Sequence, residues 1–225
     1  PKGYDLGPWR LEELASIGTD WLTLTTLDAA KLEHADVDPE KFLNNVMEAL
    51  RKADVKTLVI DVRGADGIDL AMAEQVFSII AQAPYHVVRS MSVRSGDVPA
   101  SYKYATPAPE FYASIGSTYL PESNGRRVLR PDDERLEMVR PLSKAFKGKV
   151  YVICDGLTTD AGAAFVMMAK RSGRARIVGE ETGTNASSFC GGRTLEITLP
   201  RTRCVLHLPL TRYVPEGTHS GAADR

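Results

Sequence analysis

The residues best placed to do chemistry lie in segment 156–165, which reads Gly-Leu-Thr-Thr-Asp-Ala-Gly-Ala-Ala-Phe. The run before it, residues 150–154, is short, apolar and largely β-branched, which predicts a buried strand. Residues 161–169 are rich in alanine and methionine and favour a helix. We therefore expect Asp160 to lie where a strand has ended and a helix begins. The backbone N–H groups there have no intrahelical partner and carry the positive end of the helix dipole.

Two interpretations of this turn are open. A serine at position 160 could attack an acyl group, and the N–H groups after it would stabilise the oxyanion by roughly 3–4 kcal/mol per donor. An aspartate is already the anion, and the helix N-terminus is expected to favour its charged form, which makes it a poor base at neutral pH. Alternatively, Thr158, Thr159 and Asp160 are all favoured N-cap residues, and the turn is then an ordinary helix cap.

A second strand-turn-helix unit precedes this one in the chain. Residues 56–62 predict a strand, residues 63–67 a glycine turn, and residues 69–81 a helix, which together make an α/β unit. A helix is also expected after the cap and proline at Asp38 and Pro39. The remaining pattern predicts a helix over 132–146, kinked at Pro141, and strands at residues 21–27, 86–96, 175–178, 194–199 and 203–208.

Three ordered segments carry a resemblance to a known family. They are residues 58–67 (LVIDVRGADG), 155–162 (DGLTTDAG) and 172–185 (SGRARIVGEETGTN). Together they resemble the tail-specific, C-terminal processing serine peptidases and their relatives, the tricorn core and the interphotoreceptor retinoid-binding proteins. The resemblance implies an α/β fold, the ββα spiral of the Clp-protease and crotonase type. It covers residues 21–225 as a catalytic core with an insertion at about 97–130, and leaves residues 1–20 as an N-terminal segment or the remnant of a preceding region.

The resemblance also implies site residues. The family's nucleophilic serine corresponds to Asp160, and one oxyanion donor to the backbone N–H of Ala161. The second donor would come from the glycine turn, at Gly67 or, as an alternative, Gly64. The family's lysine base corresponds to Asn185, so both reactive groups are missing. An amide is no useful proton acceptor, and a carboxylate that attacks a peptide gives a mixed anhydride that offers little gain.

Other residues could supply the missing groups. Some branches of the family use a histidine base from an earlier segment, for which His34 is the candidate, although its polar neighbours are typical of a surface loop. Ser187, Ser188 and Cys190 are alternative nucleophiles in a glycine- and serine-rich loop, where polar residues are the ordinary background. The sequence does not distinguish a natural aspartate at position 160 from an engineered replacement of serine.

Composition excludes several function classes. The 28 Lys and Arg residues nearly balance the 29 Asp and Glu residues, so no global field favours nucleic acid. No apolar run approaches the ~20 residues needed to span a bilayer, so we expect no stable membrane insertion. The four histidines and three cysteines lack metal-ligand spacing, and we expect no metal and no cofactor. The chain shows no leader-like segment, which predicts a mature product or a fragment, while the resemblance implies an extracytoplasmic or secreted protein.

Two functions from different classes follow. The favoured one is a serine-type peptidase-like hydrolase core that takes peptide or protein substrates and is inactive with Asp160 at the nucleophile position. The alternative is a non-catalytic protein that holds a peptide strand or an apolar ligand on the same fold. A thioester enzyme of the crotonase kind rests on fold alone, and a fold does not fix a function. Self-association is left open.

Overall fold

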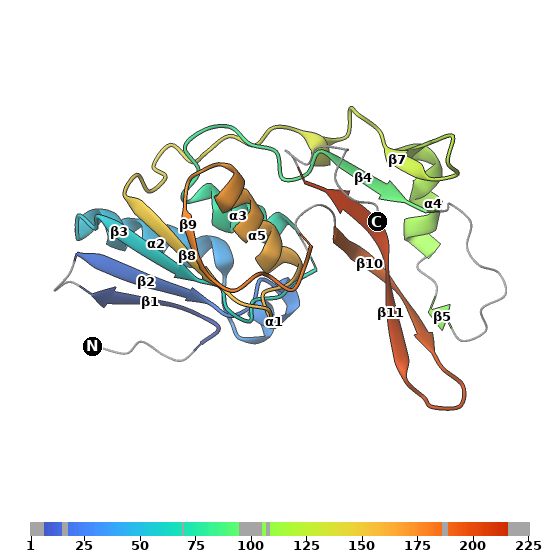
Figure 1. The fold of residues 1–225 in the computed structure, drawn as a ribbon, viewed down its shortest axis with the longest axis horizontal. Helices are drawn as coiled ribbons and strands as arrows, with labels where there is room; N and C mark the ends of the chain where they lie inside the picture. Colours follow the sequence, from blue (N-terminus) through green and yellow to red (C-terminus); the bar gives the residue numbers. More distant parts are fainter. Residues whose placement is uncertain are drawn as a thin grey trace. The chain divides into compact units, whose positions relative to one another are not determined.

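The computed structural model describes residues 7–14, 18–68, 70–94, 105–106, 109–185 and 189–215. They belong to two compact units (Figure 1). The first unit combines Pro1–Val87 with Met138–Ala186, and the second combines Val88–Glu137 with Ser187–Arg225. Each of the two units contains its own β-sheet.

The first unit is built on a five-stranded sheet in the order β1-β2-β3-β8-β9. Strand β1 pairs antiparallel with β2, and the other neighbours are parallel. The strands are β1 (Trp9–Leu14), β2 (Thr19–Leu24), β3 (Thr57–Asp61), β8 (Lys149–Cys154) and β9 (Arg176–Gly179). The sheet therefore begins with a segment inside the first twenty residues, and the division into residues 1–20 and 21–225 stays a prediction.

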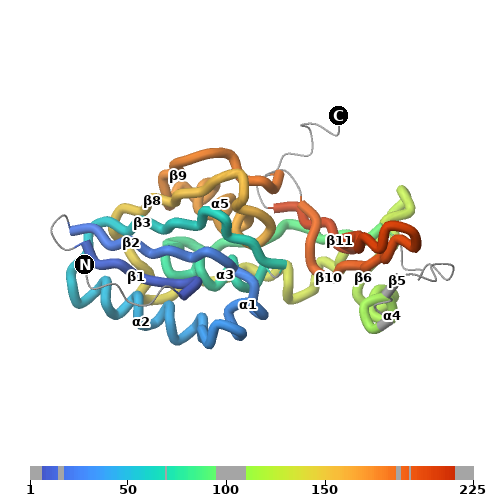
Figure 2. Tube along the Cα trace, turned by 90° about the horizontal axis from the view of Figure 1, so that it is seen from below, coloured from blue at the N-terminus to red at the C-terminus, as the bar shows by residue number. Residues whose placement is uncertain are grey.

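Four helices accompany this sheet: α1 (Ala29–His34), α2 (Pro39–Lys52), α3 (Leu70–Ser78) and α5 (Asp160–Arg171). The sequence signals at the start of α2 act as expected, since Asp38 accepts a hydrogen bond from the Lys41 N–H and a proline occupies the first turn. Helices α3 and α5 pack against each other, as Figures 1 and 2 also show. The two strand-turn-helix units predicted from the sequence, β3 to α3 and β8 to α5, are thus neighbours in space.

The two faces of the first sheet differ in burial. Alternate residues of its central strands lie in the core, and these are Leu22, Leu24, Leu58, Ile60, Val150, Val152 and Cys154. The register aligns Trp21, Val59 and Tyr151 across the other face, where all three remain partly exposed. Alternation of this kind follows from the two-residue period of a strand.

The second unit contains a six-stranded sheet in the order β5-β10-β11-β4-β7-β6. Every pairing in this sheet is antiparallel. Its elements are β4 (Ser90–Val93), β5 (Ala105–Thr106), α4 (Pro109–Thr118), β6 (Tyr119–Pro121), β7 (Arg127–Leu129), β10 (Phe189–Thr198) and β11 (Val205–Val214). Much of the segment predicted to be an insertion, residues 97–130, lies in this unit, and its role as an insertion remains a prediction.

The helix predicted over residues 132–146 is wrong. Only a short 3₁₀ turn forms there, at Glu134–Leu136. Val139 instead pairs with Tyr85 through two backbone hydrogen bonds of 2.8 and 3.1 Å, which use the groups a helix would need. Pro141 also lacks the N–H that a continuing helix requires.

Among the described helices, none is both long and apolar enough to cross a bilayer.

Candidate active site

Asp160 lies at the junction that the sequence predicts, after strand β8 and at the first residue of helix α5. Its backbone φ is +48°, in the left-handed region that aspartate and asparagine tolerate better than most residues. The N-cap residue is Thr159, and its side chain makes no capping hydrogen bond. Thr159, one of the three candidate cap residues, thus occupies the N-cap position without a side-chain cap, and residue 160 lies in a sharp bend.

Backbone contacts join this turn to the glycine turn after β3. The Thr159 N–H donates to the Ala65 carbonyl at 2.9 Å, and the buried Thr158 hydroxyl donates to the Val62 carbonyl at 2.8 Å. Gly162 has no room for a side chain, since an added Cβ would lie 2.4 Å from the Ala65 carbonyl oxygen. The two motifs recognised in the sequence thus form one continuous site.

Asp155 adds a side-chain link between the same two turns. Its carboxylate accepts hydrogen bonds from the Gly64 N–H at 3.0 Å and from the Leu157 N–H at 3.1 Å. The Gly64 bond is the largest of the causes that lower the pKa of Asp155. Gly64, the alternative oxyanion donor, is therefore already bonded to a protein carboxylate.

Gly67 and Ala161, the predicted pair of oxyanion donors, are in contact. The Ala161 N–H donates to the Gly67 carbonyl oxygen at 2.8 Å. The structure thus brings these two residues together, but the Ala161 N–H, one of the two predicted donors, is already bonded to a carbonyl oxygen. An acyl oxygen would have to displace that carbonyl before the Ala161 N–H could stabilise it.

The carboxyl group of Asp160 has a raised pKa. Burial is the larger cause, because it penalises the charged form, and the negative charge of Asp66 adds to it. Burial and Asp66 thus disfavour the charged form, in the direction opposite to the effect expected from the helix N-terminus. No hydrogen bond to this carboxyl group occurs among the residues that the structure describes, and the two N–H groups at the start of α5 go to other acceptors.

Asp66 is part of a small cluster that the sequence did not reveal. It accepts a hydrogen bond from the Thr26 hydroxyl at 2.7 Å and forms an ion pair with Lys31. Burial alone would raise the pKa of Asp66, but the bonds from Lys31 and Thr26 lower it. Asp66 therefore stays ionised near Asp160. In the sequence, only its position inside the glycine turn could have pointed to Asp66. The spacing between Lys31 and Asp66 gives no indication that the two residues pair.

Asn185, at the predicted position of the base, follows a residue that contacts the backbone of Asp160. The Asp160 N–H donates to the Thr184 hydroxyl oxygen at 2.9 Å. The Thr182 hydroxyl in turn donates to the Thr184 carbonyl at 3.0 Å, which helps to hold this segment. Asn185 is exposed, so a longer side chain at this position has space to extend.

The other candidate groups do not join this cluster in the described structure. His34 is exposed at the end of helix α1, and none of the described contacts of Asp160 involves it. Cys190 is exposed on strand β10 of the second unit. Ser187 and Ser188 lie outside the described residues. Within the described part of the chain, no group of three or more His, Cys, Asp or Glu residues could hold a metal ion.

Asp160→Asn is expected to stabilise the protein at pH 7. The folded-state pKa of Asp160 is raised, so its protonated form contributes stability below the unfolded pKa, and this contribution is lost as pH rises through the folded pKa. Asparagine has a similar shape, tolerates positive φ and carries no charge. We expect its Tm to exceed that of the parent by about 1–3 °C at pH 7, a small shift because solvent screens a half-exposed group.

Thermal unfolding of both proteins, measured from pH 3 to pH 8, checks this expectation. The difference in Tm should grow with pH, because only the parent carries the penalised charge. A difference that is independent of pH, or a lower Tm for Asp160→Asn at pH 7, would contradict it.

Comparisons with known proteins agree with this geometry. The sequence profile of peptidase family S41 matches residues 22–219. Curated protein sequences give no match. Among solved structures, mature CPAF is 14% identical with a TM-score of 0.56, and the photosystem II D1 C-terminal processing protease is 13% identical with a TM-score of 0.52. The alignments cover 89% of this chain and 44% of CPAF, and 96% of this chain and 46% of the D1 protease.

These neighbours share the fold predicted from the sequence, the α/β ββα spiral of the Clp-protease type. At identities this low, the likeness concerns the fold and not the activity. The chain spans somewhat less than half the length of the two solved proteins.

Proposed function

Since this chain belongs to peptidase family S41, we propose that it is a serine-peptidase core that recognises polypeptides and, with aspartate at position 160, does not hydrolyse them. The observation that carries the proposal is the carboxyl group of Asp160, which stands in the bend between β8 and α5 where the family's motif has serine. Family membership makes peptides or proteins the expected ligands.

The chemistry of the bend argues against turnover. Attack by the Asp160 carboxylate on a peptide would give a mixed anhydride, and no described side chain at the position of the base is able to accept a proton usefully. Asn185 carries an amide, and the nearby Lys31 amine is already paired with Asp66. Neither residue supplies the free amine that would activate a nucleophile.

The contact between Ala161 and Gly67 supports the same proposal. Catalysis of acyl transfer needs N–H donors aimed at the developing oxyanion, whereas here the Ala161 N–H is bonded to the Gly67 carbonyl at 2.8 Å. Rotation of the peptide group after Gly67 would be needed to free this donor. The protein therefore binds without presenting a complete oxyanion pocket.

A fluorophosphonate serine-hydrolase probe, read by intact mass, tests this proposal. We expect no labelling of the parent and slow labelling of Asp160→Ser, because the substitution supplies a hydroxyl nucleophile and removes the carboxylate from the site. Labelling of the parent would overturn the proposal of an inactive site. Absence of labelling in a folded Asp160→Ser protein would instead favour the alternative function, a non-catalytic binding protein that has no latent hydrolytic site.

Binding is measured separately, by fluorescence anisotropy with a library of labelled peptides of varied C-terminal sequence. Saturable binding without cleavage, followed by mass spectrometry over hours, is the expected result. Cleavage by the parent, or binding of apolar ligands in place of peptides, would contradict the proposed function.

A further inference from the structure

A pocket rich in positive charge lies in the first unit, away from Asp160. Its volume is roughly 590 Å³, and its lining includes Lys56, Lys147, Lys149, Tyr151, Arg174 and Arg176. It is located where strands β8 and β9 begin, whereas Asp160 follows the point where β8 ends. Because β8 and β9 are parallel, the pocket and the bend at Asp160 lie at opposite ends of the same strands.

The charges of this pocket are unbalanced. Five of its lining residues are cations, and none is an acid. Within the described part of the chain, Asp54 is the one carboxylate that pairs with any of the five, at 2.5 Å from the Lys56 ammonium. The whole chain is almost neutral, with a formal net charge of −1, so the concentration of cations is a local feature. Like charges gathered in one pocket repel one another unless an anion joins them.

The fold fixes one of these cations, Arg174, without using an acidic partner, and places another, Arg176, on a paired strand. Arg174 donates to the backbone carbonyls of Ile80, Phe146 and Gly148 at 2.6–2.8 Å, which holds its guanidinium group in place. Arg176 is aligned with Tyr151 in the β8–β9 register. Neighbouring residues in such a register project from the same face of a sheet. The pocket is therefore built on rigid strands.

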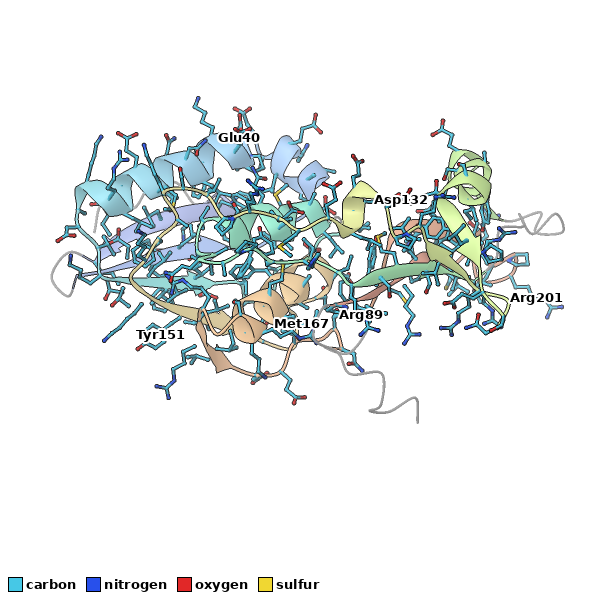
Figure 3. The ribbon with its side chains drawn as sticks, turned by 90° about the horizontal axis from the view of Figure 1, so that it is seen from above. Glu40, Arg89, Asp132, Tyr151, Met167 and Arg201 are labelled. Atoms are coloured by element: carbon cyan, nitrogen blue, oxygen red, sulfur yellow. The ribbon has the colours of Figure 1, made fainter. Side chains whose placement is uncertain are left out.

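Tyr151 adds a neutral donor and an aromatic ring to the cations. It is only partly buried, and Figure 3 shows it at the periphery of the first unit. Lys147 and Lys149 flank the glycine before β8 and are both exposed. The pocket thus combines ammonium groups, the Arg176 guanidinium group and a phenol hydroxyl, which are groups that donate hydrogen bonds to phosphate oxygens. Arg174 adds its positive charge, since its Nε and Nη2 already donate to backbone carbonyls.

We propose that this pocket binds a phosphate-bearing anion, such as a polyphosphate or a phosphomonoester group. A multiply charged phosphate matches several cations at once, whereas a single carboxylate would leave most of them unbalanced. The same chemistry occurs in soluble phosphates and in the headgroup of an anionic phospholipid such as phosphatidate. This site is independent of the function proposed for the bend at Asp160.

Isothermal titration calorimetry with inorganic tripolyphosphate tests the soluble source, and co-sedimentation with phosphatidylcholine vesicles that contain phosphatidic acid tests the lipid source. In at least one of these we expect saturable binding that weakens with added salt, because salt screens exposed charges. Binding to vesicles alone would assign a headgroup, and binding in solution a soluble phosphate. Absence of binding both to tripolyphosphate and to the vesicles would overturn the proposal.

The variant Lys147→Glu/Lys149→Glu is expected to weaken this binding about tenfold or more. Its matched control is Lys41→Glu/Arg201→Glu, which makes the same change in net charge at exposed residues outside the pocket. Circular dichroism establishes that both variants fold, and a single Lys149→Gln substitution is measured if the double variant does not. Equal weakening in the pocket and control variants would show that net charge alone acts, and would overturn the site.

Discussion

Asp160→Ser/Asn185→Lys is expected to react with a fluorophosphonate probe about 100-fold faster than Asp160→Ser alone, since a positioned general base commonly contributes at least that factor. The pair of substitutions supplies both groups that the family's motif has and this chain lacks. Labelling should be confined to the new serine, as located by mass spectrometry of the digested protein. The expectation extends the proposed function, because it takes the nucleophile and the base as the missing side chains and requires the probe oxygen to displace the Gly67 carbonyl from the Ala161 N–H.

The local geometry supports this result. Residue 185 directly follows Thr184, whose hydroxyl oxygen lies 2.9 Å from the backbone nitrogen of residue 160. Asn185 is exposed, so a lysine has room there for its four-carbon side chain. Burial and the charge of Asp66 raise the pKa of Asp160, and the substitution by serine removes this penalised charge from the site.

The control is Asp160→Ser/Asn185→Met, in which methionine has a similar length but no amine. It should label no faster than Asp160→Ser alone. The rate of the lysine variant should also rise with pH, since only the neutral amine accepts a proton. Equal rates for the lysine and methionine variants would mean that residue 185 does not act as a base, or that the Gly67 carbonyl keeps the Ala161 N–H closed to the probe.

The elements that carry the site could be predicted from the sequence because their signals are local. The apolar runs at β3 and β8 predict buried strands, the alanine-rich segment predicts α5, and the Asp38 cap predicts α2. Family motifs then indicated that the glycine turn and the bend at Asp160 belong together. The contacts between Ala65 and Thr159 and between Gly67 and Ala161 agree with that expectation.

Features that depend on distant residues could not be predicted in this way. The segment around Val139 has a helical pattern, but its backbone pairs with Tyr85, a contact that no local spacing reveals. The ion pair between Lys31 and Asp66 likewise joins residues that are far apart in the sequence. The helix dipole alone predicts the wrong direction for the pKa of Asp160, because burial and a neighbouring carboxylate outweigh it.

Gly67→Ala is expected to destabilise the protein by about 4 kcal/mol, the sum of backbone strain and overpacking. The φ of Gly67 is +134°, which residues with a side chain rarely adopt. An added Cβ would lie 2.4 Å from the Leu27 carbonyl oxygen and 2.9 Å from the Asp28 nitrogen. Both are backbone atoms, so relief would require movement of the chain itself. At this chain length the loss corresponds to a Tm lower by about 8–16 °C.

Gly64→Ala is the matched control in the same turn. Gly64 also has a positive φ, +70°, but no atom lies within 4 Å of the position of its Cβ. Only the backbone strain remains, and a loss of about 1 kcal/mol is expected. Differential scanning calorimetry of the two variants therefore separates crowding from strain, and similar losses would contradict the close approach at Gly67. Because the Gly67 carbonyl also accepts the Ala161 N–H, movement of the chain at Gly67→Ala is expected to disturb this contact with the first turn of α5 as well.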